Sequence, residues 1–331
     1  MSRFVKLAMA TAIALSLTVG AFAQKAPAKY PAKPMDFSAP AGAGGGWDTT
    51  IRMVAKALQD EKIVSVAMPV TNRPGGGGAV NLAYMQGLKG SDQFIAVYSP
   101  PLMLNQITGT SNGLGWKDTT PIARLITDFG GFYVAKNSKY KTLADVIAAL
   151  KKDPKSVKLG GTSGAGSMDH VQFLIVAKAA GIKDLRSIQY IAFQDNSGPS
   201  QLMGNHIDVF SGGIGELRGL VESGDLVSIG ITAPERLTAP IVKDYKTCKE
   251  QGYDVTFYNW RGLFGAPGMP EYALNYWRDA LAKMAKTPTW ATILQNQAWA
   301  PAYLDTADFK KFLEQNEKDF RDVLTELGMA K

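Results

Sequence analysis

The chain has 331 residues, with 36 lysines and arginines against 29 aspartates and glutamates, and a formal net charge of +7. This excess is mild and scattered, without the clustered basic stripe that nucleic-acid binding requires, so we expect no nucleic-acid partner. The single cysteine, Cys248, excludes an internal disulfide and a cysteine-rich metal site. The length suits two domains of ordinary size.

The N-terminal segment predicts export. Arg3 and Lys6 form a short basic region, residues 7–19 form an apolar run, and an A-x-A signal occupies residues 21–23. The apolar run is too short to span a bilayer, for which about 20 residues are needed. We therefore predict a signal peptide over residues 1–23, cleaved after Ala23, and a soluble mature protein in the periplasm.

Short β-rich runs then alternate with amphipathic helical patterns, which predicts an α/β fold of doubly wound sheets. Strands are predicted at 35–39, 66–71, 94–98, 131–135, 157–159, 187–192, 207–210 and 227–232. Predicted helices include 50–59, 80–88, 143–151, 168–180, 270–286 and 305–327. Thr142 and Asp145 supply a capping-box start for the third helix. Ligands of such sheets bind beyond the carboxyl ends of the strands.

The first glycine loop, PAGAGGGWDTT at residues 40–50, lies between a strand and a helix. The helix places Ile51, Val54, Ala55 and Leu58 on one apolar face. Glycines leave the backbone amides unshielded, so the loop can direct free N–H groups and the positive end of the helix dipole at an anion. The candidate ligand-binding residues here are Ala43, Gly44, Gly45, Gly46, Trp47 and Asp48.

The second glycine loop, GGTSGAGSMDH at residues 160–170, has the same strand–loop–helix order. Its hydroxyl groups lie beside backbone amides, a set that suits a carboxylate. The candidate ligand-binding residues are Thr162, Ser163, Gly164, Ala165, Gly166 and Ser167. Two anion-binding helix starts more than a hundred residues apart predict two lobes, each offering one wall of a cleft.

Several of these residues have two interpretations. Asp48 is either a first-turn acid stabilised by the helix dipole or an acceptor for a ligand group. Trp47 is either a core residue or an apolar lid, and its place in a glycine loop favours the lid. Ser167 can also be the N-cap of its helix. A third glycine cluster, NRPGGGGA at residues 72–79, is either a further ligand wall or a turn that lets the next helix pack closely.

The ends of predicted strands supply the remaining candidates, and we expect the cleft to be lined there by Ser99, Asp195, Ser211 and Gly212. We assign no arginine to the pocket.

Enzyme motifs are incomplete. The glycine loops lack the dinucleotide and P-loop spacings, and the G-x-S-x-G pattern at residues 161–165 ends in alanine. With two histidines in the chain, we assign no catalytic residue, no metal site and no cofactor. The alternatives are an exported serine hydrolase, using Ser163 or Ser167 with His170 and Asp169, and a sensor subunit that presents a ligand to a membrane kinase.

The three glycine segments, PAGAGGGWD, NRPGGGGA and GGTSGAGS, together resemble the periplasmic solute-binding proteins of tripartite tricarboxylate transporters, also called Bug receptors. The subgroup nearest to this chain is the citrate-type TctC proteins. The resemblance covers almost the whole mature chain and extends to residues 140–143, 204–209 and 250–253.

The resemblance implies a two-lobed Venus-flytrap fold with two crossover segments. We expect residues 34–128 and 234–331 to form one lobe and residues 129–233 to form the other. It further implies a monomeric binding protein without enzymatic activity, whose first and second glycine loops hold a carboxylate, partly through waters. The ligand would be a tricarboxylate or dicarboxylate, citrate-like by the Trp47 loop. Lobe closure around it would then be recognised by membrane permease subunits.

Overall fold

The computed structural model describes residues 27–193 and 197–331. The predicted signal peptide and cleavage site, and the candidate Asp195, lie outside these residues. No helix in the described ranges has the length and hydropathy needed to cross a bilayer.

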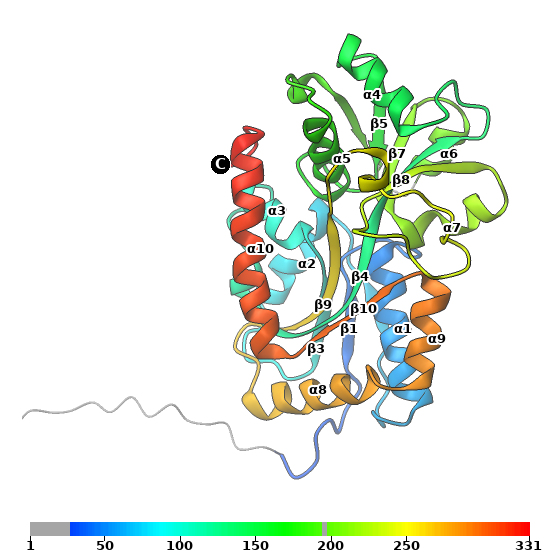
Figure 1. The fold of residues 1–331 in the computed structure, drawn as a ribbon. Coiled ribbons are helices and arrows are strands. Elements are labelled where there is room, and N and C mark those ends of the chain that lie inside the picture. Colours follow the sequence, from blue (N-terminus) through cyan, green and yellow to red (C-terminus); the bar gives the residue numbers. More distant parts are fainter. Residues whose placement is uncertain (1–26, 194–196) are drawn as a thin grey trace, which may run out of the picture.

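Across the described residues, one curled sheet of ten strands has the order β2-β1-β3-β9-β4-β7-β5-β6, with β8 and β10 also paired to β4 (Figure 1). The strands are β1 (Asp36–Ala39), β2 (Val70–Asn72), β3 (Phe94–Tyr98), β4 (Thr120–Ala135), β5 (Lys158–Gly161), β6 (Gln189–Ala192), β7 (Val209–Gly213), β8 (Leu226–Ile231), β9 (Tyr258–Gly265) and β10 (Ala300–Leu304). The parallel strands β2, β1 and β3 lie at one end, and the parallel strands β7, β5 and β6 at the other.

The long strand β4 joins the two halves of the sheet. Its first part pairs with β9 and β10, and its last part pairs with β7 and β8. The sequence predicted only residues 131–135 of this strand and neither β9 nor β10. Nearly all of β4 is buried, so its side chains do not alternate between apolar and polar. The pattern that marks a half-buried strand is therefore missing.

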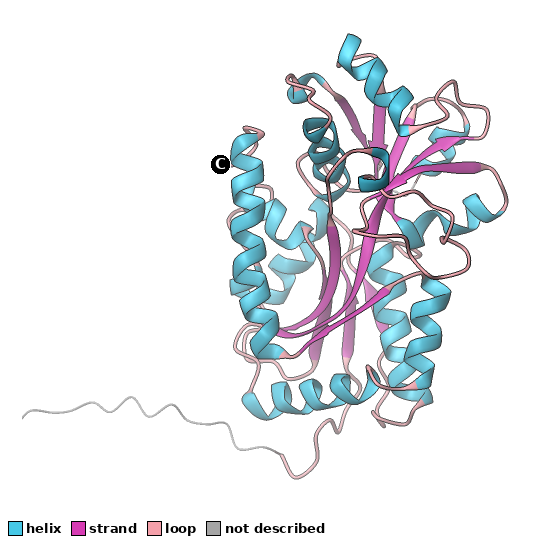
Figure 2. Ribbon diagram, in the orientation of Figure 1, coloured by secondary structure: helices cyan, strands magenta, loops and turns pink. Residues whose placement is uncertain are grey.

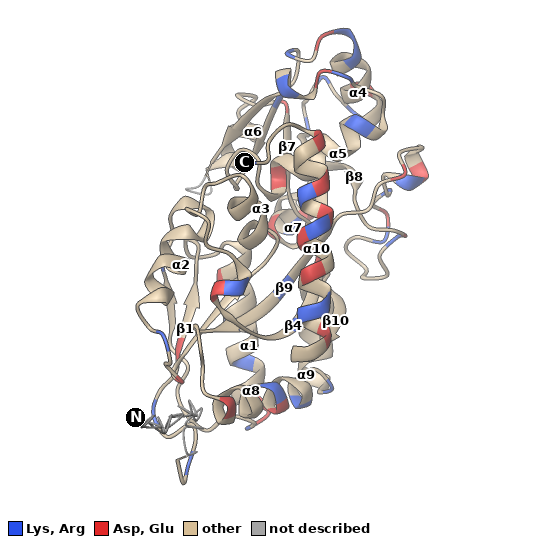
Figure 3. Ribbon diagram, turned by 90° about the vertical axis from the view of Figure 1, so that its left-hand side faces the viewer, with Lys and Arg blue, Asp and Glu red and all other residues tan. Residues whose placement is uncertain are grey.

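Helices cover both faces of the first half (Figure 2). Helices α1 (Gly46–Asp60), α8 (Glu271–Met284) and α9 (Pro288–Gln297) pack on one side around Phe37, Trp277 and Trp290. Helices α2 (Ala79–Gln86), α3 (Pro101–Ile107) and α10 (Thr306–Glu326) pack on the other. Charges of both signs follow the exposed side of α10 (Figure 3), where they form i,i+4 pairs such as Lys318–Asp322.

The second half has the same layering. Helices α4 (Leu143–Lys152) and α5 (Met168–Ala179) cover one face, and α6 (Gly198–Met203) and α7 (Ile214–Glu222) cover the other. The predicted capping box of α4 is confirmed, since the Thr142 hydroxyl accepts the Asp145 amide and the Asp145 carboxylate accepts the Thr142 amide. Short 3-10 turns occur at Gly76–Gly78, Trp116–Asp118, Leu185–Ser187 and Lys249–Gln251.

The sequence analysis placed the return from the second half to the first at residue 234, and several later residues still contact the second half. Cys248 and Val255 belong to the core of the second half, and the Cys248 amide donates to the Ile231 carbonyl. The crossing lies near Phe257, whose amide donates to the Thr232 carbonyl, while the Thr232 amide donates to Gly130 in β4. These contacts favour a lobe boundary after residue 234, and the boundary itself stays a prediction.

Candidate functional site

A pocket opens between the two halves. The first half contributes the loops before α1 and α2 and the end of β3, and the second half contributes the loop before α5 and the start of α7. The lining residues are Pro40, Ala41, Gly42, Gly45, Gly46, Trp47, Pro74, Gly75, Gly77, Ser99, Pro101, Thr162, Ser163, Met168, Asp169, Glu216, Asn259 and Arg261.

The first glycine loop ends at the N-terminus of α1, where Gly45 and Gly46 line the pocket. No described residue accepts a hydrogen bond from the amides of Gly46 or Trp47. Both belong to the first turn of α1, whose N–H groups lack partners within the helix. The positive end of the helix dipole therefore faces the pocket. Ala43 and Gly44, in contrast, are exposed and do not line it.

The Asp48 side chain stabilises this loop through hydrogen bonds. Its buried carboxylate accepts hydrogen bonds from the Gly44 amide at 2.9 Å, from Arg52 Nε at 2.9 Å and from Asn72 Nδ2 at 2.8 Å. Burial acts to raise the pKa of Asp48, but the hydrogen bonds from Arg52, Gly44 and Asn72 outweigh it and the pKa is lowered. Asp48 is not among the lining residues, so the structural interpretation fits its position.

Trp47 forms a fixed apolar wall. Its indole Nε1 donates to Ser99 Oγ at 2.9 Å, and its ring meets the edge of Tyr98 with centroids 5.9 Å apart. Trp47 and Ser99 both line the pocket. Trp47 also packs against two hydrophobic core clusters, so its position fits both the core and the lid interpretation. The Ser99 hydroxyl hydrogen remains free to donate elsewhere.

The third glycine cluster contributes a wall as well, through Gly75 and Gly77. Four consecutive glycines, at positions 75–78, have φ angles between 54° and 132°, a region that other residues rarely adopt. Asn105 Nδ2 donates to the Gly77 carbonyl at 2.9 Å and holds this turn. The glycines are therefore required by the backbone conformation that brings the turn to the pocket.

The second glycine loop differs from expectation. Its amides were predicted to be free for a bound anion, yet those of Thr162 and Ser163 both donate to Asp169 Oδ2 at 2.8 Å. The Ser163 hydroxyl accepts the Asp169 amide at 2.9 Å. Thr162 and Ser163 line the pocket, but a carboxylate of the chain itself already occupies this cradle.

The other predicted residues of the second loop do not line the pocket: Gly166 and Ser167 are buried, Gly164 is half-buried and Ala165 is exposed. The Gly166 amide donates to His170 Nδ1, the Ser167 amide donates to the Gly164 carbonyl, and Gly164 and Ala165 do not line the pocket. Ser167 precedes α5 at the N-cap, without a side-chain cap hydrogen bond.

Ser211 and Gly212 were expected to line the cleft from a strand end. Both are instead buried inside β7, where Gln172 Nε2 donates to the Ser211 hydroxyl at 2.7 Å. The strand continues past its predicted end at residue 210, so the residue that reaches the pocket is Glu216, at the start of α7.

Sequence reasoning missed the charged centre of the site, Arg261. This buried side chain of β9 donates through Nη1 to the Gly46 carbonyl and to Thr50 Oγ1. Through Nη2 it reaches Asp128 Oδ2 at 3.0 Å and Glu216 Oε1 at 3.3 Å. It thus connects the start of α1, the middle of β4 and the start of α7. β9 was not predicted as a strand, and no local motif marks Arg261.

The acids around Arg261 are hard to ionise. Burial raises the pKa of Asp128 to about 7, although the charge of Arg261 lowers it. Burial and the nearby Glu216 raise the pKa of Asp169 to about 7, against the hydrogen bonds from Ser163 and Thr162. Burial also raises the pKa of Glu216, opposed by Arg261. Asp128 and Glu216 therefore share one guanidinium in a low-dielectric space, and Asp169 feels the charge of Glu216.

Some buried polar atoms of this site have no hydrogen-bond partner in the described structure. They include Asp169 Oδ1, both side-chain polar atoms of Asn259, and Arg261 Nε. Buried polar groups are normally paired, and unpaired ones at a pocket mark positions for a ligand or water. The site therefore offers one unpaired acceptor on Asp169, one donor on Arg261, and one of each on Asn259.

The side chains of Ser163, His170 and Asp169 are not arranged as a Ser–His–Asp catalytic triad. His170 Nδ1 accepts the Gly166 amide at 3.1 Å, and its ring stacks on Tyr190 with centroids 4.4 Å apart. Burial lowers the pKa of His170 to about 4. The Asp169 carboxylate accepts hydrogen bonds from the Thr162 and Ser163 amides and not from the His170 imidazole. The described residues also contain no cluster of three or more potential metal ligands.

Two layered halves on a shared sheet, with a pocket between them, define the fold class of periplasmic binding proteins. Residues 50–329 match the family model described as the tripartite tricarboxylate transporter family receptor. The chain therefore belongs to this family, which confirms the resemblance seen in the glycine segments.

Three solved structures illustrate the similarity. A TctC solute-binding protein from Polaromonas is 25% identical, with a TM-score of 0.65 over 90% of this chain and 100% of that one. MatC from Rhodopseudomonas palustris, solved with bound malate, is 17% identical, with a TM-score of 0.78 over 89% and 100%. The R. palustris protein Rpa4515, solved with adipate, is 18% identical, with a TM-score of 0.82 over 91% and 99%.

Proposed function

We propose that this protein captures a small dicarboxylate or tricarboxylate, citrate-like in size, in the periplasm and delivers it to the membrane permease of a tripartite tricarboxylate transporter. The family membership supports the role of a solute receptor. Two proteins of the same fold carry malate and adipate in their structures, and both ligands are dicarboxylates.

The observation that carries the proposal is the start of α1 in the pocket. The unpaired amides of Gly46 and Trp47 and the helix dipole favour a carboxylate at this position. Ser99 and the Arg261 Nε–H add donors around it. The apolar ring of Trp47 would cover the carbon chain of the ligand.

Closure of the two lobes would enclose the bound ligand. We assign residues 34–128 with 258–331 to one lobe and residues 129–257 to the other. Arg261 and Glu216 come from different lobes and form an ion pair at 3.3 Å across the pocket. A ligand that contacts both lobes would favour the closed state, which the permease would then recognise without any chemical step.

A thermal-shift screen against mono-, di- and tricarboxylates tests this function. Binding stabilises the folded state by about 2.7 kcal/mol when the ligand is at a hundred times its Kd. We expect at least one carboxylate to raise the melting temperature, and neutral sugars and cations to have no effect. A melting temperature raised only by sugars or cations would contradict the proposal.

An esterase assay on the same protein tests the hydrolase alternative. We expect no turnover, because His170 is turned to the Gly166 amide and Asp169 to the amides of the second loop. Turnover that disappears with Ser163→Ala would replace the binding function with a catalytic one.

A further inference from the structure

We propose that Asp169 and Glu216 form a subsite for a hydrogen-bond-donating substituent of the ligand, a hydroxyl or an ammonium on its carbon chain. This inference rests on the proposed function and narrows its ligand class. The preferred ligand would be a hydroxy- or aminocarboxylate rather than a plain polycarboxylate.

The first step is the unequal distribution of hydrogen-bonding groups. The start of α1 presents donors, whereas the loop before α5 presents a carboxylate whose Oδ2 is occupied by the Thr162 and Ser163 amides. Its other oxygen, Oδ1, is buried and has no partner in the described structure. Asp169 lines the pocket, and its unpaired carboxyl oxygen could accept a hydrogen bond from a ligand donor.

The second step is charge. Asp169 and Glu216 both line the pocket, and they lie close enough for Glu216 to affect the ionisation of Asp169. Arg261 is the one cationic side chain among the lining residues, and its Nη2 already serves Asp128 and Glu216. This half of the pocket therefore presents carboxyl oxygens with few cationic partners, and a ligand hydroxyl or ammonium would complement them.

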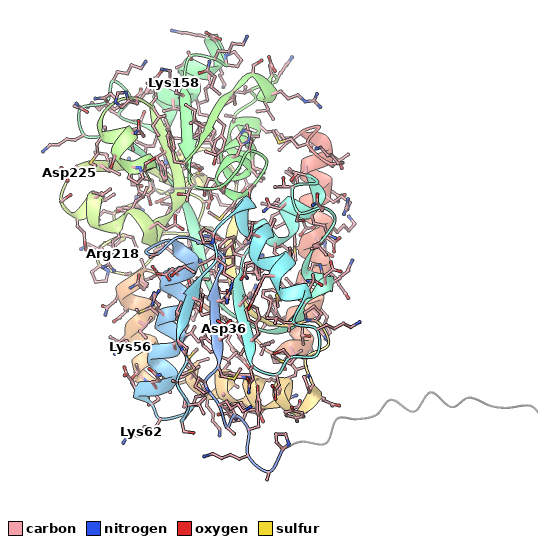
Figure 4. The ribbon with its side chains drawn as sticks, turned by 180° about the vertical axis from the view of Figure 1, so that it is seen from behind. Asp36, Lys56, Lys62, Lys158, Arg218 and Asp225 are labelled. Atoms are coloured by element: carbon pink, nitrogen blue, oxygen red, sulfur yellow. The ribbon has the colours of Figure 1, made fainter. Side chains whose placement is uncertain are left out.

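The third step is the position of Asp169. The charged side chains labelled in Figure 4, among them Lys56, Lys158 and Asp225, lie on the outside of the molecule. Asp169 is only 1% exposed, and α5 begins one residue before it. Because two amides and the packing of α5 fix its carboxylate, Oδ1 has a defined direction. A fixed acceptor can discriminate between ligands that differ by one donor.

The test compares four-carbon dicarboxylates that differ only at carbon 2, by calorimetry on the mature protein. Succinate has no donor there, both enantiomers of malate have a hydroxyl, and both enantiomers of aspartate have an ammonium. Citrate and tricarballylate form a second matched pair. We expect the preferred donor-bearing member to bind about ten- to a hundredfold more tightly than its plain counterpart. Comparing the affinities for malate and aspartate shows whether the subsite prefers a hydroxyl or an ammonium group.

Asp169→Asn supplies the matched variant. The asparagine carbonyl can still accept the hydrogen bonds from the Thr162 and Ser163 amides. Its NH₂ group puts a donor where Oδ1 was an acceptor. We expect the preference for the donor-bearing ligand to disappear, with succinate bound at least as tightly as before. Asp225→Asn, at an exposed carboxylate, is the control and should keep the wild-type preference.

The outcomes separate the two proposals. Equal affinity of the wild-type protein for succinate, malate and aspartate would overturn this inference and leave the proposed function intact. The same holds if Asp169→Asn folds and keeps the wild-type ratio. If no carboxylate in either set binds, the proposed function itself fails. The comparison on the wild-type protein stands even if the variant does not fold.

Discussion

Replacing Arg261 with methionine should destabilise the protein strongly above neutral pH. Methionine keeps an unbranched apolar stem but removes the cation that faces Asp128 and Glu216 at 3.0 and 3.3 Å. It also removes the two Nη1 hydrogen bonds to the Gly46 carbonyl and to the Thr50 hydroxyl oxygen. Removing one partner of a buried ion pair typically costs about 3–5 kcal/mol. For a chain of this size, that corresponds to a fall in melting temperature of roughly 10 °C.

The effect should depend on pH with a definite sign. Asp128 has a folded-state pKa of about 7, above the value of about 3.9 for an unfolded chain. The folded state therefore holds the Asp128 proton more tightly than the unfolded chain does. The contribution of this group to the free energy of unfolding falls as the pH rises from about 3.9 to about 7. Without Arg261, the folded pKa of Asp128 would rise further. We expect the variant to lose most stability at pH 8 and much less at pH 5.5.

Denaturant titrations at both pH values measure this difference. Arg218→Met is the control, because Arg218 pairs with Glu222 at 3.8 Å on the surface and such pairs contribute about 0–1 kcal/mol. Asp128→Asn combined with Arg261→Met should recover part of the loss. If Arg261→Met costs no more than Arg218→Met, or costs the same at both pH values, the assignment of Arg261 as the charge that supports the pocket is wrong.

Three further predictions concern the same region. Gly46→Ala should lower carboxylate affinity at least tenfold by titration calorimetry, because a Cβ there would collide with Arg261 and Glu216, whereas Gly219→Ala meets nothing and should bind normally. Asp48→Ala should cost about 1–3 kcal/mol in denaturant unfolding at neutral pH, because it removes the buried acceptor of the Gly44, Arg52 and Asn72 hydrogen bonds. This difference should shrink in acid, since the stability from a lowered pKa is lost as the carboxylate protonates. His170, with a folded pKa of about 4 against about 6.5 unfolded, should reduce stability as the pH falls from 6.5 to 4, and His170→Gln should remove that part of the pH dependence.

Part of the site follows from local sequence. Glycines at positions 44–46 before an apolar helical stripe can only expose a helix start, so Gly45, Gly46 and Trp47 were correctly placed at the pocket. Ser99 was found in the same way, from the end of a strand whose burial is continuous. These predictions succeed because loop, helix and strand signals lie within a dozen residues of each other.

The second loop shows where such reasoning fails. Its glycines and hydroxyl residues gave the same signal as the first loop, but Asp169 folds back onto the Thr162 and Ser163 amides. The sequence contains both Asp48 and Asp169 shortly after a glycine loop. Only the loop conformation determines that the first carboxylate lies behind the pocket and the second lies at its surface.

The sequence alone therefore determined the class of fold, the family and the two loops that face each other across the pocket, because these depend on local backbone requirements. The tertiary structure alone decided the charge of the pocket. Arg261, Asp128 and Glu216 are separated by up to 133 residues along the chain and lie in three different elements. They meet because β4 passes through both halves of the sheet and pairs with β9 and β7, a pairing for which no short segment carries a signal.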